Sequence, residues 1–90
     1  GKKPLQRNAV IALANYRDRT AIPELLRMIE QGPRPVLRGT AAWAIAEIVR
    51  EPNPEMLAFF SERLIIETDE ETKAEMEKAY LKMLEIQKTD

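Results

Sequence analysis

The sequence predicts an all-α fold, a short α-solenoid of five helices that form about two and a half helix pairs. Apolar residues recur three and four positions apart along most of the chain, which is the spacing of one helix face. A helix pair also repeats: residues 8–15 (NAVIALAN) match residues 40–47 (TAAWAIAE), and residues 23–29 (PELLRMI) match residues 54–60 (PEMLAFF). Two-helix units that recur about every 32 residues stack side by side into a solenoid.

The residues that favour helix ends place each of the five helices. These residues are Pro4, Pro35 and Pro54 in first turns, Thr20, Asn53 and a Thr68–Glu71 capping box as N-caps, and Gly32 as a C-terminal end. We therefore expect helices near residues 4–16, 20–31, 35–50, 53–66 and 69–88. No segment alternates apolar and polar residues as a half-buried strand would.

Residue size predicts how the helices pack. The first helix of each pair carries alanines on its expected inner face, which allow close helix approach: Ala9, Ala12, Ala41 and Ala44. The second helices carry larger side chains that we expect to fill the space between two layers, among them Leu25, Leu26, Ile29, Met56, Leu57, Phe60 and Leu64. In the last helix we expect Met76, Ala79, Tyr80, Met83 and Leu84 to face inward.

Composition limits the chemistry that this chain can perform. The 90 residues include no cysteine and no histidine, which excludes disulfides, thiolate metal sites and imidazole acid–base catalysis in this chain. The lone serine, Ser61, has no histidine to activate it, so we expect no catalytic residue here. No apolar run approaches the roughly 20 residues that cross a bilayer, and we expect a cytoplasmic protein with no membrane partner.

Charge is divided unevenly along the chain. Residues 1–40 hold eight Lys and Arg against three acidic residues, whereas residues 41–90 hold six against twelve. The basic residues gather at the N-terminal ends of the first and third expected helices: Lys2, Lys3 and Arg7, and Arg34 and Arg38. Cations beside free helix N–H groups form an anion site, which predicts phosphate contact, although a solvated charged surface is the alternative.

Two uncharged polar residues occupy matched positions beside these cations. Asn8 and Thr40 lie in the first turns of their helices, where an amide and a hydroxyl could bond phosphate or ribose oxygens. Capping or local backbone bonding is the equal alternative for both residues. At the corresponding end of the last helix, residues 69–71 are all acidic, so the basic pattern stops there.

The repeated segments resemble known helical repeats. The segments LRGTAAWAI (37–45) and LQRNAVIAL (5–13) resemble the first helix of HEAT-like repeats, which carries the pattern V-R-x-x-A-A-x-A-L. The order LQRNAVIALAN, AIPELL, LRGTAAWAI resembles more closely the C-terminal HEAT-like region of the tRNA epoxyqueuosine reductases. Members of that family commonly have histidine where this chain has Thr40.

The resemblance implies a function that composition does not show. It implies that residues 1–90 are a single HEAT-like repeat domain, a fragment of a larger oxidoreductase of queuosine biosynthesis that holds cobalamin and two [4Fe–4S] clusters elsewhere. The fragment itself would hold no cofactor and no metal. Its partners would be the tRNA anticodon stem-loop and the catalytic domain of the same chain. The stem-loop would be contacted through the basic edge, by which we mean the two basic helix ends with Lys2, Lys3, Arg7, Arg34 and Arg38. The alternative function is a HEAT-like protein–protein interaction scaffold with no nucleic-acid role.

The single tryptophan has three possible roles. The repeat alignment places Trp43 over Ile11, so both first helices carry a bulky apolar residue away from the alanine face. Burial inside the helix stack is the interpretation that we favour, with Gly39 one turn earlier leaving room for the indole. The other two are contact with the missing catalytic domain and stacking on a nucleotide base.

Overall fold

The computed structural model describes residues 5–88 and contains five α-helices within that range. They are α1 (Arg7–Asn15), α2 (Ile22–Gln31), α3 (Pro35–Ile48), α4 (Pro54–Ile66) and α5 (Glu70–Lys88), with a 3-10 turn, η1 (Arg19–Ala21), before α2. The all-α class and the five helices predicted from the sequence are therefore confirmed.

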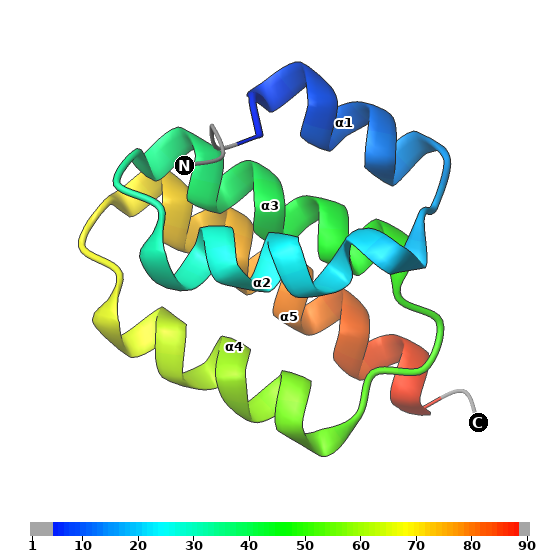
Figure 1. The fold of residues 1–90 in the computed structure, drawn as a ribbon. Coiled ribbons are helices and arrows are strands. Elements are labelled where there is room, and N and C mark those ends of the chain that lie inside the picture. The colour runs from blue at the N-terminus through cyan, green and yellow to red at the C-terminus, as the bar shows by residue number, and fades with distance from the viewer. Residues whose placement is uncertain (1–4, 89–90) are drawn as a thin grey trace.

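The helices form two layers (Figure 1). Helices α1, α3 and α5 lie side by side in one layer, because α3 packs against both of its neighbours. Helix α2 packs on α3 and helix α4 packs on α5, which makes the second layer. Helix α5 thus takes the position of a first helix in a third, incomplete pair, as the repeat pattern predicts.

Helix α3 is the most deeply buried element because other helices cover it on three sides. One apolar stripe of α3, which the helical spacing of its residues places on a single face, is buried along its whole length: Leu37, Ala41, Ala44, Ile45 and Ile48. Helices α4 and α5 add Phe60, Met76 and Met83, each at most 1% exposed. The small residues of α3 allow its neighbours to approach closely, and the larger residues fill the space between the layers.

Helix α1 buries a different face from the one that the repeat predicts. The buried residues are Val10 and Ala14, whereas Ala12 is exposed, so the expected inward position of Ala12 was wrong. Helix α1 lies at the end of its layer and packs mainly against α3, so it covers only the side that faces α3. Sequence repetition alone could not show that the terminal helix lacks the second neighbour that α3 has.

One predicted N-cap is confirmed and another is wrong. The Asn53 side chain accepts a hydrogen bond of 2.8 Å from the N–H of Met56 at the start of α4, as expected. Thr20, in contrast, lies inside the 3-10 turn, and the residue that caps this turn is Asp18. The Asp18 carboxylate accepts from both the backbone N–H and the hydroxyl of Thr20, at 3.0 and 2.6 Å.

The expected capping box of the last helix is shifted by one residue. Asp69 accepts a hydrogen bond of 3.0 Å from the N–H of Thr72, so Asp69 caps α5 in place of Thr68. Helix α1 begins at Arg7, later than expected, and Pro4 lies outside the described residues. Gly32 ends α2 as predicted, and a Cβ at this position would collide with the carbonyl oxygen of Met28.

Arg17 adopts a left-handed backbone conformation directly after α1. Its φ is 50°, and the Arg17 and Asp18 N–H groups each donate 3.0 Å bonds to the last turn of α1, to Ala14 and Leu13. Glycine adopts this conformation without the steric cost of a Cβ.

We expect Arg17→Gly to raise the free energy of unfolding by a few tenths to about 1 kcal/mol, because the relief of strain exceeds the added freedom of the unfolded chain. Urea denaturation would measure the change. Arg19→Gly, inside the 3-10 turn, is the control and should destabilise the protein. A loss of stability in Arg17→Gly would show that the arginine side chain matters more than the backbone strain.

Candidate nucleic-acid interface

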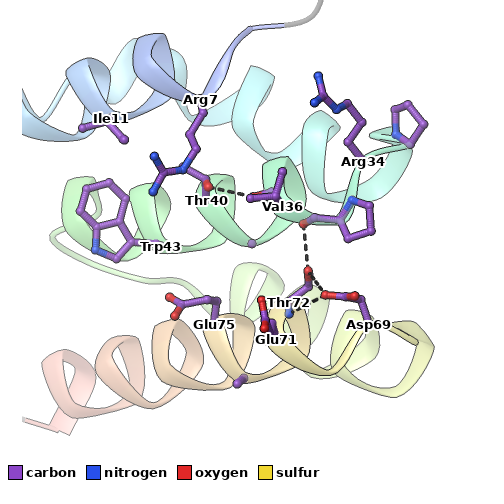
Figure 2. Close-up of a pocket in the computed structure, with 14 residues that line it drawn as sticks. Arg7, Ile11, Arg34, Val36, Thr40, Trp43, Asp69, Glu71, Thr72 and Glu75 are labelled. Atoms are coloured by element: carbon purple, nitrogen blue, oxygen red, sulfur yellow. Dashed lines mark hydrogen bonds between the residues drawn. The ribbon is translucent and has the colours of Figure 1, made fainter.

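A cleft of about 940 Å³ crosses the layer that α1, α3 and α5 form. Helix α3 makes its floor, and α1 and α5 make its two sides (Figure 2). The side chains of Arg7 and Ile11 reach it from α1, Thr40 and Trp43 line it from α3, and Glu75 lines it from α5. The cleft therefore brings together residues that the sequence places on separate repeats.

The basic side of the cleft carries two exposed arginines. Arg7 is the first residue of α1 and points toward Thr40 and Trp43, and Arg34 immediately precedes α3 (Figure 2). Within residues 5–88, neither arginine forms an ion pair or a side-chain hydrogen bond. No group in the described residues therefore competes with an anion for either guanidinium.

The start of α1 adds backbone donors to these two cations. The start of α3 adds fewer, because Pro35 has no N–H and the N–H of Leu37 already donates to the carbonyl of Arg34 at 3.1 Å. No side chain caps α1 at Gln6 or α3 at Arg34. The first helical bond of α1 runs from the N–H of Val10 to the carbonyl of Gln6, so the N–H groups of the preceding turn have no acceptor within residues 5–88. Open N–H groups at a helix start attract anions, as does the positive end of the helix dipole.

Asn8 and Thr40 differ in their availability. Asn8 is exposed beside Arg7, and its amide makes no side-chain hydrogen bond within the described part of the chain. The Thr40 hydroxyl donates a 2.8 Å bond to the carbonyl of Val36, one turn back in α3. The Thr40 hydroxyl is therefore bonded to the local backbone, which is one of the two alternatives given for these residues. Its proton is used in that bond, so toward the cleft the hydroxyl can only accept a hydrogen bond.

Arg38 is committed to a bond inside the protein. Its Nε and Nη2 atoms donate to the two carboxylate oxygens of Glu67 at 2.8 and 2.9 Å, and Nη1 donates to the carbonyl of Gly32 at 2.8 Å. The Arg38 side chain is 16% exposed and that of Glu67 only 4%. Our expectation that Arg38 offers its charge to phosphate is corrected by this geometry, because a nearly buried carboxylate already neutralises the guanidinium.

The electrostatics of this pair are strong. The two-bond contact with Arg38 lowers the pKa of the Glu67 carboxyl from an ordinary 4.5 to about 2, against the opposing effect of burial. The same hydrogen bonds raise the pKa of Arg38. The N–H of Asp69 donates a further bond of 3.0 Å to Glu67. Arg38 and Glu67 thus tie the start of α3 to the link between α4 and α5.

The opposite side of the cleft is acidic. Asp69, Glu71 and Glu75 line it from the N-terminal part of α5, which agrees with the expected end of the basic pattern (Figure 2). The Thr72 hydroxyl lies 2.7 Å from the Asp69 carboxylate and 2.9 Å from the Pro35 carbonyl, to one of which it donates at a time. Thr72 therefore holds the acidic wall against the start of α3.

Trp43 is only partly buried, so the interpretation that we favoured, burial inside the helix stack, holds in part. Its side chain is partly buried, packs against the core on one side and lines the cleft on the other. The Ile11 side chain, which occupies the position in α1 equivalent to Trp43 in α3, projects toward the indole ring (Figure 2). Within residues 5–88, no further helix covers the ring on the side of the cleft.

Two functional side chains were missed by sequence reasoning. Sequence reasoning singled out neither Glu67 nor Glu75. The available signal was the position of Arg38 near the N-terminal end of a helix, where the helix dipole disfavours a positive charge. A cation at such a position is stabilised by a nearby carboxylate. Lys2 and Lys3, also predicted to contact RNA, lie outside the described residues.

The described residues show two further features of the chain. None of the five helices in residues 5–88 is both long enough and apolar enough to traverse a bilayer. The same residues contain no group of three or more acidic side chains arranged to hold a metal ion.

Comparison with known proteins defines the class. The family model for HEAT repeats matches residues 2–80, so this chain belongs to the HEAT repeat family. The chain is homologous, at about 50% identity, to the C-terminal HEAT-repeat part of epoxyqueuosine reductase, a queuosine tRNA modification enzyme. The fold and the resemblance predicted from the sequence are confirmed.

Three relatives illustrate this similarity. Epoxyqueuosine reductase of Bacillus subtilis is 50% identical over 78 residues, which are 87% of this chain and 19% of that protein. An uncharacterized protein in the gldA 3′ region of Geobacillus stearothermophilus is also 50% identical over 78 residues, covering 87% of this chain and 35% of its own length. A crystal structure of epoxyqueuosine reductase with a tRNA-Tyr epoxyqueuosine-modified tRNA stem loop superposes with a TM-score of 0.78 and 46% identity, over 93% of this chain and 22% of that chain. This chain therefore spans about a fifth to a third of the length of these relatives.

Proposed function

We propose that this chain is a tRNA-binding accessory region of an epoxyqueuosine reductase-like enzyme, and that it contacts the backbone of an anticodon stem-loop. The observation that carries the proposal is a pair of arginines, Arg7 and Arg34, which have no side-chain partner within residues 5–88 and lie at the uncapped starts of two adjacent helices. A homologous enzyme has been crystallised with a tRNA stem loop, which supports RNA as the anion.

The chemistry of the basic edge favours the RNA backbone over the bases. The candidate groups are two guanidinium groups, open helix N–H groups and the Asn8 amide, all of which suit phosphate and ribose oxygens. Recognition of this kind fixes the position of an RNA without reading its sequence. Arg38 is not part of the proposed surface, because its guanidinium already donates to Glu67 and to the carbonyl of Gly32.

The reducing chemistry would belong to other parts of a longer protein. The donor set of this chain does not fit the implied [4Fe–4S] clusters or an axial ligand to cobalamin, because it contains no cysteine and no histidine. We propose that the cofactors and the catalytic residues lie in a catalytic domain of the same protein, which this region would adjoin.

A protein-interaction scaffold remains the second candidate function. Two large apolar side chains favour it: Ile65, which is 82% exposed at the end of α4, and Leu81, which is 55% exposed on α5. A scaffold surface of this kind would bind through apolar burial, and its affinity would therefore change little with salt.

Salt dependence separates the two functions. We expect Arg7→Ala and Arg34→Ala each to weaken binding of an anticodon stem-loop RNA, whatever the loop sequence, because each removes one phosphate contact. Each variant should also reduce the magnitude of the slope of log K against log salt by about 0.7 to 0.9. Fluorescence anisotropy of a labelled stem-loop, titrated at several salt concentrations, measures both quantities.

Arg50→Ala is the matched control, since Arg50 is an exposed arginine that follows the opposite end of α3. It changes the net charge by the same amount and should leave the slope unchanged. Slopes that stay unaltered in both Arg7→Ala and Arg34→Ala, or affinity that is independent of salt, would refute the phosphate contact and favour the scaffold.

A further inference from the structure

The cleft between α1 and α5 carries opposite charges on its two sides, which a surface that binds only phosphate does not require. Arg7 lies on one side, Glu71 and Glu75 lie on the other, and the indole of Trp43 lines the space between them (Figure 2). Phosphate groups would be attracted to the first side and repelled by the second. The acidic wall therefore suits a group that donates hydrogen bonds, and the floor suits an apolar ring.

A single nucleotide combines these three properties in the same order. Its phosphate is an anion, its base is a flat ring that stacks on aromatic side chains, and the outer edge of the base carries N–H donors. Trp43 packs against the core on one side, which holds the indole in place, while the cleft leaves part of the ring accessible. A rigid, partly exposed aromatic ring is the usual platform for an unpaired base.

The charge of the acidic wall selects among the four bases. Glu75 is 43% exposed on its side chain, and its one ion pair is a 3.6 Å contact between Oε1 and Lys78 on the surface of α5. A carboxylate accepts two parallel hydrogen bonds, and guanine is the natural base whose pairing edge presents two adjacent N–H donors. Uracil presents only one N–H there, flanked by carbonyl oxygens that a carboxylate repels.

We propose that the cleft binds one unpaired guanine nucleotide of an RNA strand, with the base stacked on Trp43, its phosphate on Arg7 and its edge hydrogen-bonded to Glu75. This inference rests on the proposed RNA-binding function and deepens it by naming a base-specific site. Trp43 lies nine positions after Arg34, a rise of about 13 Å along the helix. A neighbouring part of the strand would thus run along α3 toward Arg34.

The chain supplies its own reporter for this site, because Trp43 is its only tryptophan. The test compares two unstructured RNA pentamers, UUGUU and UUUUU, by quenching of Trp43 fluorescence and by anisotropy of the labelled RNA. We expect UUGUU to quench the emission saturably and to bind roughly tenfold more tightly than UUUUU, the discrimination of one good carboxylate–base contact.

Two variants separate stacking from edge recognition. Trp43→Ala should weaken UUGUU binding roughly 5- to 100-fold in the anisotropy measurement, the value of one lost stacking contact. Glu75→Gln, a change at the surface that does not threaten folding, should bring the UUGUU and UUUUU affinities together. Glu77→Gln is the control, because Glu77 is exposed on the opposite face of α5, and it should preserve the preference.

Each possible result decides the matter. A preference for UUGUU that depends on Glu75 and is accompanied by Trp43 quenching supports the site. Salt-dependent RNA binding with unchanged Trp43 emission, or with equal affinities for the two pentamers, overturns the base site and leaves the backbone contact standing. Absence of binding to either pentamer, with the stem-loop still bound, overturns the base site alone, whereas absence of stem-loop binding as well overturns the proposed function and the base site together.

Discussion

Replacing Arg38 with methionine is expected to lower the free energy of unfolding by about 3 to 5 kcal/mol at neutral pH. The change leaves the Glu67 carboxylate, whose side chain is 4% exposed, without the two hydrogen bonds that neutralise it. The backbone N–H groups of Asp69 and Thr68 would then be the donors left to this carboxylate. An uncompensated buried charge costs far more than the loss of an ordinary surface ion pair.

The effect of Arg38→Met should depend on pH. In the native protein the pKa of Glu67 is about 2, below its ordinary value of 4.5. Folding therefore stabilises the carboxylate form of Glu67 over the protonated form. The resulting stability is fully present above pH 4.5 and is lost as the pH falls through 2. The difference between native protein and variant should therefore shrink as the pH is lowered from about 5 to 2.

Urea denaturation at several pH values would measure both effects. Arg27→Met is the control, because Arg27 pairs with Glu24 at the surface of α2 with 57% of its side chain exposed, and it should cost under about 1 kcal/mol. The double variant Arg38→Met/Glu67→Met should recover most of the loss, since it removes both charges. A cost in Arg38→Met no larger than that in Arg27→Met would contradict a stabilising role for the buried pair.

The second large effect is expected in the core between the layers. Phe60 on α4 is 1% exposed and packs in the main cluster of buried side chains, as its place in the repeat predicted. Its ring meets that of Phe59 edge to face, with centroids 6.0 Å apart. Phe60→Ala should lower the free energy of unfolding by about 3 to 5 kcal/mol, through lost transfer energy and the cavity that remains.

Two neighbouring substitutions calibrate this result in the same denaturation experiment. Ser61→Ala, at an exposed position of α4, should change stability by no more than about 0.5 kcal/mol. Phe59→Ala should fall between the two, because Phe59 is only partly buried. An equal loss in Phe59→Ala and Phe60→Ala would show that the edge-to-face pair, and not the depth of burial, sets the energy.

Local sequence determined the helices and several of their contacts. The spacing of Leu37, Ala41 and Ile45 gave one apolar face, and that face is buried in the structure. Asn53 caps α4 because its short side chain reaches the N–H of Met56 three residues later, an interaction that needs no distant partner. Features of this kind depend on residues within about one helical turn, so a sequence pattern is sufficient to predict them.

Tertiary structure decided which face of each helix meets which neighbour. Val10 and Ala14 are buried in α1 because the terminal helix packs mainly against α3, although the repeat pattern favoured another face. The distribution of charge at the basic edge was decided in the same way. Arg7 and Arg38 look alike in sequence, yet Arg38 meets a carboxylate 29 residues away and Arg7 has no ion-pair partner in residues 5–88.

Trp43 shows the same division between local and distant information. Its position on α3, away from the alanine face, followed from the helical period alone. Whether that side of α3 is enclosed or open depends on α1 and α5, which flank a cleft there and leave it uncovered. The period of a helix fixes the direction of a side chain, but only the packing of separate helices decides whether that direction leads to core, to an ion-pair partner or to solvent.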